Sequence, residues 1–347
     1  MESEAMEYRY LGNSGLKISV LGFGNMTSGW SEGTEQWSFD CVDKCIRGGV
    51  NFFDTAEFYG MGVAETILGN NIKQGGWDRD DLVITTKFIP TKAVGIQGLS
   101  RKRLRQAINH SLKRLQLDYV DVLYLHRFDC EVPLEESIRI VNELIDDDKA
   151  FYWGTSEFNA QQLAECHAIC EKHGWIHPIA EQVQYHMFER AEVERDYVPI
   201  YKEYGMGTTV WGPLAGGLLS GKYNDGNIQP GRFESGPFSQ VYRQRFETYV
   251  GSRKEAAVKT LQGLKSLADE LGCSQAQLAL AWVIKNPDVT TAILGASSPA
   301  QLDGSLAAVE VMKKLTPEVL ARIEDLLGNR PAPSMNWRNF TPNPPRR

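Results

Sequence analysis

Short apolar runs rich in β-branched residues alternate with longer amphipathic segments along most of this 347-residue chain. Apolar runs of four to seven residues bounded by turn residues predict buried strands. Eight are expected, at Val20–Phe23, in the run ending at Asp54, and at Leu82–Lys87, Val120–Leu125, Phe151–Ser156, Ile179–Gln184, Gly207–Trp211 and Thr290–Leu294. Apolar residues at helical spacing predict three clear helices: Leu104 to Leu115 after Ser100 as N-cap, Ile138 to Ile145, and Val258 to Leu271 before Gly272.

The alternation of strands and helices predicts a parallel α/β fold. Eight parallel strands close a barrel, so a (β/α)8 TIM barrel is expected, with its functional site on the C-terminal face. An open doubly wound sheet is the alternative, but no Gly-x-Gly-x-x-Gly follows an early strand. Before the first strand, Tyr8–Leu11 and Leu16–Ser19 flank a Gly12–Gly15 turn, which predicts a β-hairpin.

Charged or polar residues stand at the ends of three successive predicted strands. Asp54 closes one run, Lys87 closes the next, His126 follows the third, and Tyr59 lies in the loop after Asp54. Each alone is more often a surface or core residue, but the ends of parallel barrel strands converge on one face. A carboxylate at the mouth of a buried strand also requires a cation as partner, which Lys87 offers. The four residues together therefore predict a catalytic site.

With these residues in place the chain resembles the aldo-keto reductase family, (β/α)8 barrels that use a nicotinamide cofactor. Within that family it is most similar to the β subunits of voltage-gated potassium channels and their enzyme relatives. The resemblance runs from about Tyr8 to Pro331. The stretches that carry it are Phe-Asp-Thr-Ala-Glu-Phe-Tyr-Gly (53–60), Trp-Gly-Thr-Ser (153–156), Glu-Gln-Val-Gln-Tyr-His-Met-Phe (181–188), Gly-Lys-Tyr (221–223) and Gly-Ala-Ser (295–297). In the family, the hairpin plugs the N-terminal end of the barrel.

The resemblance implies that Asp54, Tyr59, Lys87 and His126 form a catalytic tetrad for reducing aldehydes or ketones. Tyrosine with a pKa near ~10 is a poor acid at neutral pH unless a cation stabilises its phenolate. Lys87 would supply that cation, Asp54 would keep Lys87 charged, and Tyr59 would donate the proton. His126 would orient the carbonyl oxygen, and the hydride belongs to the cofactor.

The resemblance also implies NADP(H) as cofactor and the residues that hold it. Ser156 and Gln182 would contact the nicotinamide carboxamide. The stretch from Trp211 to Ala215, at the end of a strand, would stack on the cofactor and contact its phosphates. Lys222 and Arg232 would also bind phosphates, and Ser297 with Gln301 would bind the adenosine 2′-phosphate. The full expected set is Gly24, Asn25, Met26, Asp54, Ser156, Gln182, Trp211, Gly212, Pro213, Leu214, Ala215, Lys222, Arg232, Gly295, Ser297 and Gln301.

Three positions depart from the channel-subunit pattern. Glu157 replaces a basic residue, Gly304 and Ser305 replace Glu-Asn beside the adenine, and Gly24-Asn25-Met26 replaces Gly-Thr-Trp at the substrate pocket. The alternative function is a cytoplasmic nucleotide-sensing channel subunit with vestigial activity. His126 favours the enzyme, since animal channel subunits carry asparagine there. A carbonyl compound is the expected small-molecule partner, and the resemblance adds a homo-tetramer and a channel as further candidates.

Composition restricts the expected partners and cellular location of the protein. The net charge of −7 argues against a nucleic-acid partner, and no apolar run is long enough to insert in a membrane. The acidic N-terminus is no secretory signal, so a cytoplasmic protein is expected. Residues 1–331 are expected to form one barrel domain, and 332–347 a flexible tail.

Two further stretches allow more than one interpretation. Cysteines spaced by four at Cys41/Cys45 and Cys166/Cys170 are expected to be helix-face hydrophobes rather than metal ligands. The long segment Asn224–Lys254 interleaves aromatic side chains with arginines. It is either a lid over a phosphate-bearing ligand or an insertion whose aromatics pack locally.

Overall fold

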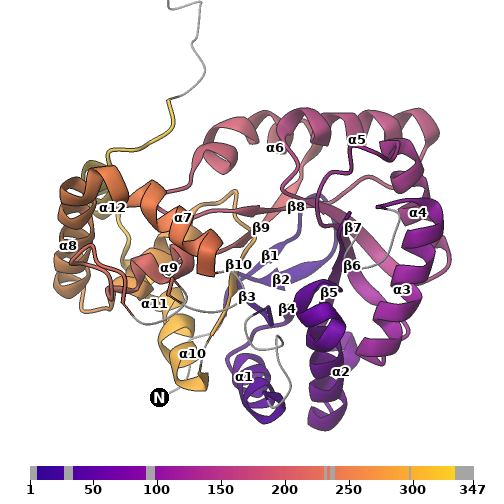
Figure 1. Ribbon diagram of the computed structural model, residues 1–347, viewed down its shortest axis with the longest axis horizontal. Coiled ribbons are helices and arrows are strands. Elements are labelled where there is room, and N and C mark those ends of the chain that lie inside the picture. The colour runs from indigo at the N-terminus through magenta and orange to yellow at the C-terminus, as the bar shows by residue number, and fades with distance from the viewer. Residues whose placement is uncertain are drawn as a thin grey trace, which may run out of the picture.

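The computed structural model of the chain describes residues 6–26, 34–90, 98–229, 233–234, 239–296 and 298–332. Within these ranges eight strands close into a barrel in the order β10-β3-β4-β5-β6-β7-β8-β9, and every neighbouring pair is parallel. Helices surround the barrel in a ring (Figure 1). The predicted (β/α)8 barrel is confirmed, and each barrel strand lies within one residue of its expected place.

The strands are β1 Tyr8–Tyr10, β2 Lys17–Ser19, β3 Leu21–Gly24, β4 Phe52–Asp54, β5 Val83–Phe88, β6 Val120–Leu125, β7 Ala150–Ser156, β8 Ala180–Gln184, β9 Gly207–Trp211 and β10 Thr291–Leu294. The helices are α1 Glu35–Arg47, α2 Val63–Gly75, α3 Arg101–Leu115, α4 Leu134–Asp146, α5 Ala160–His173, α6 Val198–Tyr204, α7 Ser239–Tyr249, α8 Lys254–Glu270, α9 Gln275–Lys285, α10 Pro299–Leu306, α11 Ala308–Lys314 and α12 Pro317–Leu327.

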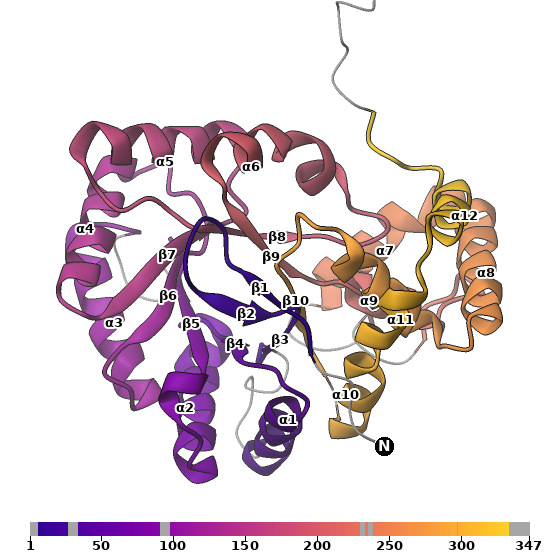
Figure 2. The same ribbon diagram turned by 180° about the vertical axis from the view of Figure 1, so that it is seen from behind.

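The N-terminal hairpin closes the bottom of the barrel, where the parallel strands begin (Figure 2). β1 and β2 pair antiparallel, and Leu11, which follows β1, and Ile18 of β2 are fully buried. These two side chains belong to a cluster inside the barrel that includes Phe52, Val83 and Tyr124. Burying that apolar surface closes the N-terminal end of the barrel, as the family resemblance implied, and leaves the C-terminal face as the open one.

The helices follow the predicted apolar periods, with local differences at their starts. α8 begins at Lys254, ahead of the first periodic apolar residue, Val258. Ser100 precedes α3 in an extended conformation, but its hydroxyl is buried without a hydrogen-bond partner instead of capping the helix. Side-chain caps do form before α5 and α9, where Asn159 and Ser274 each make a reciprocal capping box. The cysteines of α1 and α5 are buried on their inward faces, as predicted.

The segment after β9 contains a helix that the sequence did not predict. α7 lies beside the C-terminal face of the barrel (Figure 1). Phe233 and Phe246 are buried and meet Tyr223 and Tyr242 edge to face. These aromatics therefore pack on one another, as the insertion interpretation expects. Other side chains of the same helix line the cavity of the candidate site, so the segment has both features.

Two expectations concern the chain as a whole. Among the described residues, no helix is long and apolar enough to cross a membrane. The expected tail at 332–347 lies almost entirely outside the described residues, which end at Ala332. The division into one barrel domain and a flexible tail stays a prediction.

Candidate active site

Three neighbouring strands deliver three of the four predicted catalytic residues to one end of the barrel. Asp54 is the last residue of β4, Lys87 stands one residue before the end of β5, and His126 follows β6 directly. Tyr59 begins a short 3-10 turn after β4, over Tyr59–Gly62. Because these ends lie at the C-terminal face of a parallel barrel, the structure brings the four residues together.

A buried ion pair joins Asp54 and Lys87. The Lys87 ammonium lies 2.5 Å from Oδ2 of Asp54 and donates a second bond to the carbonyl oxygen of Thr55 at 2.7 Å. Oδ1 of Asp54 accepts from Oγ1 of Thr85 at 2.7 Å and from Nε2 of Gln182 at 3.0 Å. The Lys87 side chain is fully buried and that of Asp54 nearly so, which makes the mutual partnership obligatory.

Tyr59 lies between this pair and His126. Its ring is 4.9 Å from the Lys87 ammonium and meets the imidazole edge to face, with ring centres 5.9 Å apart. Burial, then the negative charge of Asp54, raises the pKa of Tyr59 well above its usual value, while Arg127 acts in the opposite direction. The phenol is therefore protonated at neutral pH. The Lys87 ammonium is paired with Asp54, as the sequence analysis expected, and its role in stabilising a phenolate stays a prediction.

His126 is uncharged at neutral pH. Burial, together with the positive charges of Lys87 and Arg127, holds the pKa of His126 well below its usual value. Its backbone N–H donates to the carbonyl of Phe88, which fixes the residue to the end of β5. Nδ1 is buried and has no partner among the described residues, whereas Nε2 is the ring nitrogen open to the cavity. A neutral imidazole in this position can donate or accept one hydrogen bond there.

Arg127 is a functional candidate that the sequence analysis missed. Its Nη1 donates to the carbonyl oxygen of His126 at 2.5 Å and to the hydroxyl of Ser156 at 3.2 Å. The guanidinium borders the same cavity as Tyr59. The only available signal was its position directly after His126 at a strand end.

Buried carboxylates support the site from behind. Glu57 accepts bonds from Arg103 and from the backbone N–H of Ile89, so it ties the loop after β4 to the end of β5. Glu65 accepts from Thr86, the residue before Lys87, and from Arg114. These bonds anchor the backbone on both sides of Lys87.

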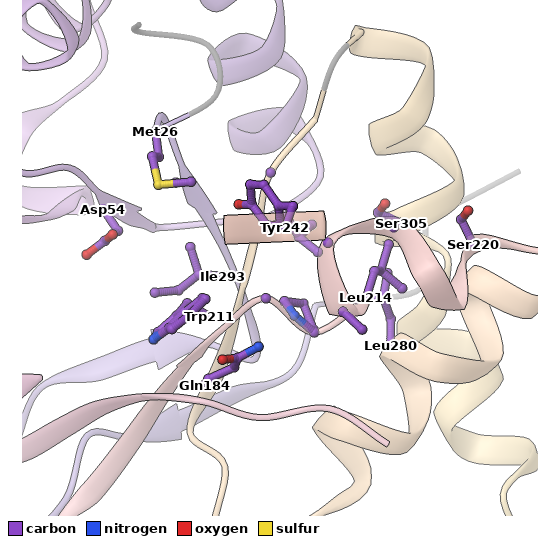
Figure 3. A pocket seen from close by; sticks show the side chains of 18 of the residues that line it. Met26, Asp54, Gln184, Trp211, Leu214, Ser220, Tyr242, Leu280, Ile293 and Ser305 are labelled. Atoms are coloured by element: carbon purple, nitrogen blue, oxygen red, sulfur yellow. The ribbon is translucent and has the colours of Figure 1, made fainter. Parts of the chain in front are cut away.

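A cavity of about 740 Å³ runs away from the catalytic end. Asp54 and Met26 lie at one end, Ser220 and Ser305 at the other, and Trp211, Gln184 and Leu214 lie between them (Figure 3). Thirteen of the sixteen residues expected to bind cofactor line it: Gly24, Met26, Asp54, Ser156, Gln182, Trp211, Gly212, Pro213, Leu214, Ala215, Lys222, Gly295 and Gln301. The elongated shape suits a ligand longer than a single ring.

The other three expected residues have different outcomes. Arg232 and Ser297 lie outside the described residues. Asn25 is buried, and its side-chain amide donates to the carbonyl oxygen of Ala64 in the first turn of α2. The structure thus turns Asn25 toward the helix layer and does not bring it to the cavity. The backbone N–H of Asn25 pairs with Asp54 on the neighbouring strand, which explains its local role.

Trp211 is held by two side chains outside the expected set. Its indole N–H donates to Oε1 of Glu157 at 2.8 Å, and the same oxygen accepts from the backbone N–H of Gln184. The guanidinium of Arg245, from α7, lies 4.9 Å from the centre of the Trp211 ring. Glu157 adopts a left-handed conformation with φ of 60°. The substitution noted at this position in the sequence therefore has a structural consequence, since an acid can accept the indole bond and a base cannot.

The chemistry of the lining fits a nicotinamide dinucleotide. At the catalytic end, Nε2 of Gln182 is bound to Asp54, so Oε1 is left to accept from a carboxamide. Gly212, Gly216 and Gly217 have positive φ along the middle of the cavity, where their backbones border the space without side chains. At the far end lie Lys222 and the start of α10, a cation and a helix N-terminus suited to phosphate.

Among the described residues, no group of three or more histidine, cysteine or acidic side chains is placed to hold a metal ion. Two strongly perturbed titratable groups, Tyr59 and His126, lie at the catalytic end of the cavity. A strongly shifted acid beside a neutral imidazole in a cleft is a recognised mark of a functional site.

Comparison with known proteins identifies the family. Residues 20–327 match the family model described as "Aldo/keto reductase family". The chain belongs to the aldo/keto reductase family. It is 44% identical over 339 residues to a protein named "Putative voltage-gated potassium channel subunit beta" from Schizosaccharomyces pombe. That alignment covers 96% of this chain and 94% of the relative. Proteins named "Probable voltage-gated potassium channel subunit beta" from Arabidopsis thaliana and from Oryza sativa subsp. japonica are 42% and 40% identical, over 96% of this chain and the whole of each relative.

The aldo/keto reductase assignment makes the general chemistry that of an oxidoreductase using a nicotinamide cofactor. The resemblance to the channel-subunit branch, inferred from the sequence motifs, is confirmed by the same matches.

Proposed function

We propose that this chain is an NADPH-dependent carbonyl reductase, with Tyr59 as the proton donor to an aldehyde or ketone. The observation that carries the proposal is the convergence of a protonated buried phenol, a neutral imidazole and a buried Lys–Asp pair at one end of a long cavity. The family match supports oxidoreductase chemistry in general. The substrate class and the proton donor are the further steps proposed here.

The reaction divides between a cofactor and the chain. A nicotinamide bound in the cavity supplies the hydride to the carbonyl carbon. Tyr59 donates its phenolic proton to the carbonyl oxygen, so one C–H and one O–H bond form as the C=O bond becomes single. Nε2 of His126 donates a hydrogen bond to the same oxygen and stabilises the charge that develops on it. The ammonium of Lys87 stabilises the phenolate left after the transfer, at 4.9 Å from the ring.

The preference for NADPH rests on the far end of the cavity. Gln301 lies on the first turn of α10 and lines the cavity there. Each charge-assisted hydrogen bond to a 2′-phosphate contributes about 1.5–3 kcal/mol, so two such bonds favour NADPH over NADH at least roughly a hundredfold. Gly304 leaves open space, and Ser305 is short, so contacts to the adenine are few. That loss lowers the affinity for both cofactors without changing their ratio.

Two measurements test the proposal. Dissociation constants for NADPH and NADH are measured by fluorescence titration of the purified protein, and NADPH oxidation is followed with simple aromatic and aliphatic aldehydes. Tyr59→Phe lowers the rate by about 10²–10⁴-fold, because it removes only the proton donor, and leaves the affinity for NADPH nearly unchanged. If Tyr59→Phe keeps activity within a few-fold of the parent, Tyr59 is not the proton donor. Equal affinities for NADPH and NADH exclude a binding site for the 2′-phosphate.

A second candidate is a cytoplasmic β subunit of a voltage-gated potassium channel, with the nucleotide as a sensor. The names of the three relatives favour it. It is compatible with reductase activity, because nucleotide binding and catalysis share one cavity. Co-purification of the tagged chain with a potassium channel expressed in the same cells tests this role. A channel that elutes without the chain, under conditions where the chain binds NADPH, argues for the enzyme alone.

A further inference from the structure

The catalytic end of the cavity carries one positive charge that no carboxylate balances. Among the described residues, Lys87 is paired with Asp54, Arg103 with Glu57, and no acidic side chain lies within 4 Å of the Arg127 guanidinium. Arg127 is half-buried. A partly buried guanidinium whose hydrogen-bond acceptors are all neutral can be stabilised further by an anionic ligand.

The hydrogen bonds of Arg127 leave a pair of donors unused. Both of its bonds within the described residues come from Nη1, one to the carbonyl oxygen of His126 and one to the hydroxyl of Ser156. Neither Nε nor Nη2 is among the buried atoms without a partner, so both reach solvent, and Arg127 is one of the residues that line the cavity. The two neutral acceptors fix the plane of the guanidinium. The edge formed by Nε and Nη2 is the edge that binds a carboxylate with two parallel hydrogen bonds.

The position of this edge relates it to the substrate. His126 and Tyr59, the two residues that would contact a carbonyl oxygen, line the same end of the cavity as Arg127. The positive charge of Arg127 also lowers the pKa values of Tyr59, Lys87 and His126, in line with its place in the same cavity. A substrate whose carbonyl reaches Tyr59 therefore passes within reach of the guanidinium.

We propose that Arg127 is a specificity-determining residue that selects carbonyl substrates carrying a carboxylate. The proposal rests on the carbonyl reductase activity proposed above and narrows its substrate class. Ser156 ties Arg127 to the region where a nicotinamide carboxamide would bind, so loss of Arg127 also disturbs the cofactor. Substrate selection and cofactor positioning are separated by comparing matched substrates at saturating NADPH.

Carboxybenzaldehydes and nitrobenzaldehydes make the matched pair, because carboxylate and nitro groups have nearly the same shape and differ in charge. Kinetic constants are measured for the 3- and 4-isomers of both, which place the anionic group at two distances from the carbonyl. In the parent, kcat/KM for the carboxybenzaldehyde relative to the nitrobenzaldehyde is higher than the intrinsic reactivities of the two aldehydes predict. In Arg127→Gln the ratio of kcat/KM for carboxy- over nitrobenzaldehyde falls about ten- to a hundredfold for at least one isomer, as expected on losing a charged hydrogen-bonding partner.

Two control variants sharpen the comparison. Arg127→Lys keeps the charge but not the two-pronged geometry, so it retains part of the ratio. Arg245→Gln removes the other arginine that lines the cavity beside Trp211, and leaves the ratio unchanged. A ratio unchanged in Arg127→Gln, or lowered equally in Arg245→Gln, overturns the proposal.

A binding measurement keeps the test independent of turnover. The 4-carboxy- and 4-nitrobenzyl alcohols are titrated into the NADPH complex by calorimetry. Arg127→Gln weakens binding of the carboxylated alcohol by the same ten- to hundredfold factor and leaves the nitro alcohol unchanged. Equal binding of the carboxylated alcohol by parent and variant overturns the proposal. Absence of turnover with 4-nitrobenzaldehyde contradicts the reductase function instead, so the two failures are distinguishable.

Discussion

The buried pair of Lys87 and Asp54 permits a quantitative prediction about stability. Replacing one partner leaves the other charge buried without an opposite charge, which costs about 3–5 kcal/mol of unfolding free energy. The two losses are unequal. After Lys87→Met, Asp54 keeps the bonds from Thr85 and Gln182, whereas after Asp54→Asn the Lys87 ammonium has only neutral acceptors, the carbonyl of Thr55 and the new amide oxygen. We therefore expect Asp54→Asn at the upper end of that range and Lys87→Met at the lower end.

The double variant of Lys87→Met and Asp54→Asn tests whether the unpaired charge causes the loss of stability in the single variants. With both charges removed, no uncompensated ion remains, and a buried pair replaced by neutral groups is often neutral or stabilising. We expect the double variant within about 2 kcal/mol of the parent, hence a coupling energy of about 6 kcal/mol or more between the two sites. Guanidinium unfolding followed by fluorescence and circular dichroism gives the four free energies.

An exposed pair serves as the matched control. Lys265 and Asp269 form an i,i+4 pair on α8 whose side chains are about half exposed. Because solvent screens this pair, the same cycle there should give a coupling of about 0.3–0.5 kcal/mol. If the losses for Lys87 and Asp54 add within about 0.5 kcal/mol, the two residues are energetically independent and the obligatory partnership is refuted.

Three further predictions concern the surroundings of the site. Glu157→Ala removes the acceptor of the Trp211 indole and weakens NADPH binding by about tenfold, measured by fluorescence titration, while Glu157→Gln loses less because its amide oxygen still accepts. Burial lowers the pKa of His186 in the folded protein to about 3, so the unfolded chain binds a proton that the folded protein does not, and the folded state loses stability as the pH falls below about 6.5. Replacing His186 with Asn removes this loss. The variant should therefore show a slope of unfolding free energy against pH, between pH 6 and 5, that is smaller by about 1.4 kcal/mol per pH unit. NADPH slows proteolysis within 224–254 if that segment closes over the cofactor, and equal cleavage rates with and without NADPH exclude a lid.

The barrel and the place of its catalytic residues could be predicted from the sequence, because parallel barrel strands all end on the same face. Eight apolar runs gave strands within one residue of their observed places, and parallel closure then made neighbours of residues 30 or more positions apart, such as Asp54 and Lys87. Pattern reasoning failed where tertiary context decides the outcome. Asn25 belongs to a strand-end triplet that resembles a pocket wall, yet its amide turns to α2 because the carbonyl of Ala64 is within reach.

Arg127 was missed in the sequence analysis, and Glu157 was noted there only as a departure from the channel-subunit pattern. Each stands beside a predicted residue, His126 and Ser156, and each makes a side-chain hydrogen bond to a residue far along the chain, Arg127 to Ser156 and Glu157 to Trp211. A spacing rule identifies which strand end a residue occupies, but not which neighbour its long side chain will reach. The same reasoning explains why α7 was unexpected: its aromatics are spaced for contacts with Tyr223 and Phe233 rather than for one continuous apolar stripe.

The electrostatics of the site argue for the order in which its parts act. The Lys87 charge is balanced by Asp54 and the imidazole of His126 is neutral, so the field at Tyr59 keeps its phenol protonated, ready to give a proton to a developing alkoxide. Once that proton has left, the phenolate lies 4.9 Å, measured from its ring centre, from an ammonium that donates to two protein oxygens, Oδ2 of Asp54 and the carbonyl oxygen of Thr55. Arg127 adds a second positive charge. Burial and the Asp54 carboxylate nevertheless disfavour the phenolate, as the raised pKa of Tyr59 shows. The proton transfer therefore depends on the stronger basicity of the alkoxide that forms as hydride reaches the carbonyl carbon. The site gives up the proton only as that charge develops, which is the differential stabilisation that catalysis requires.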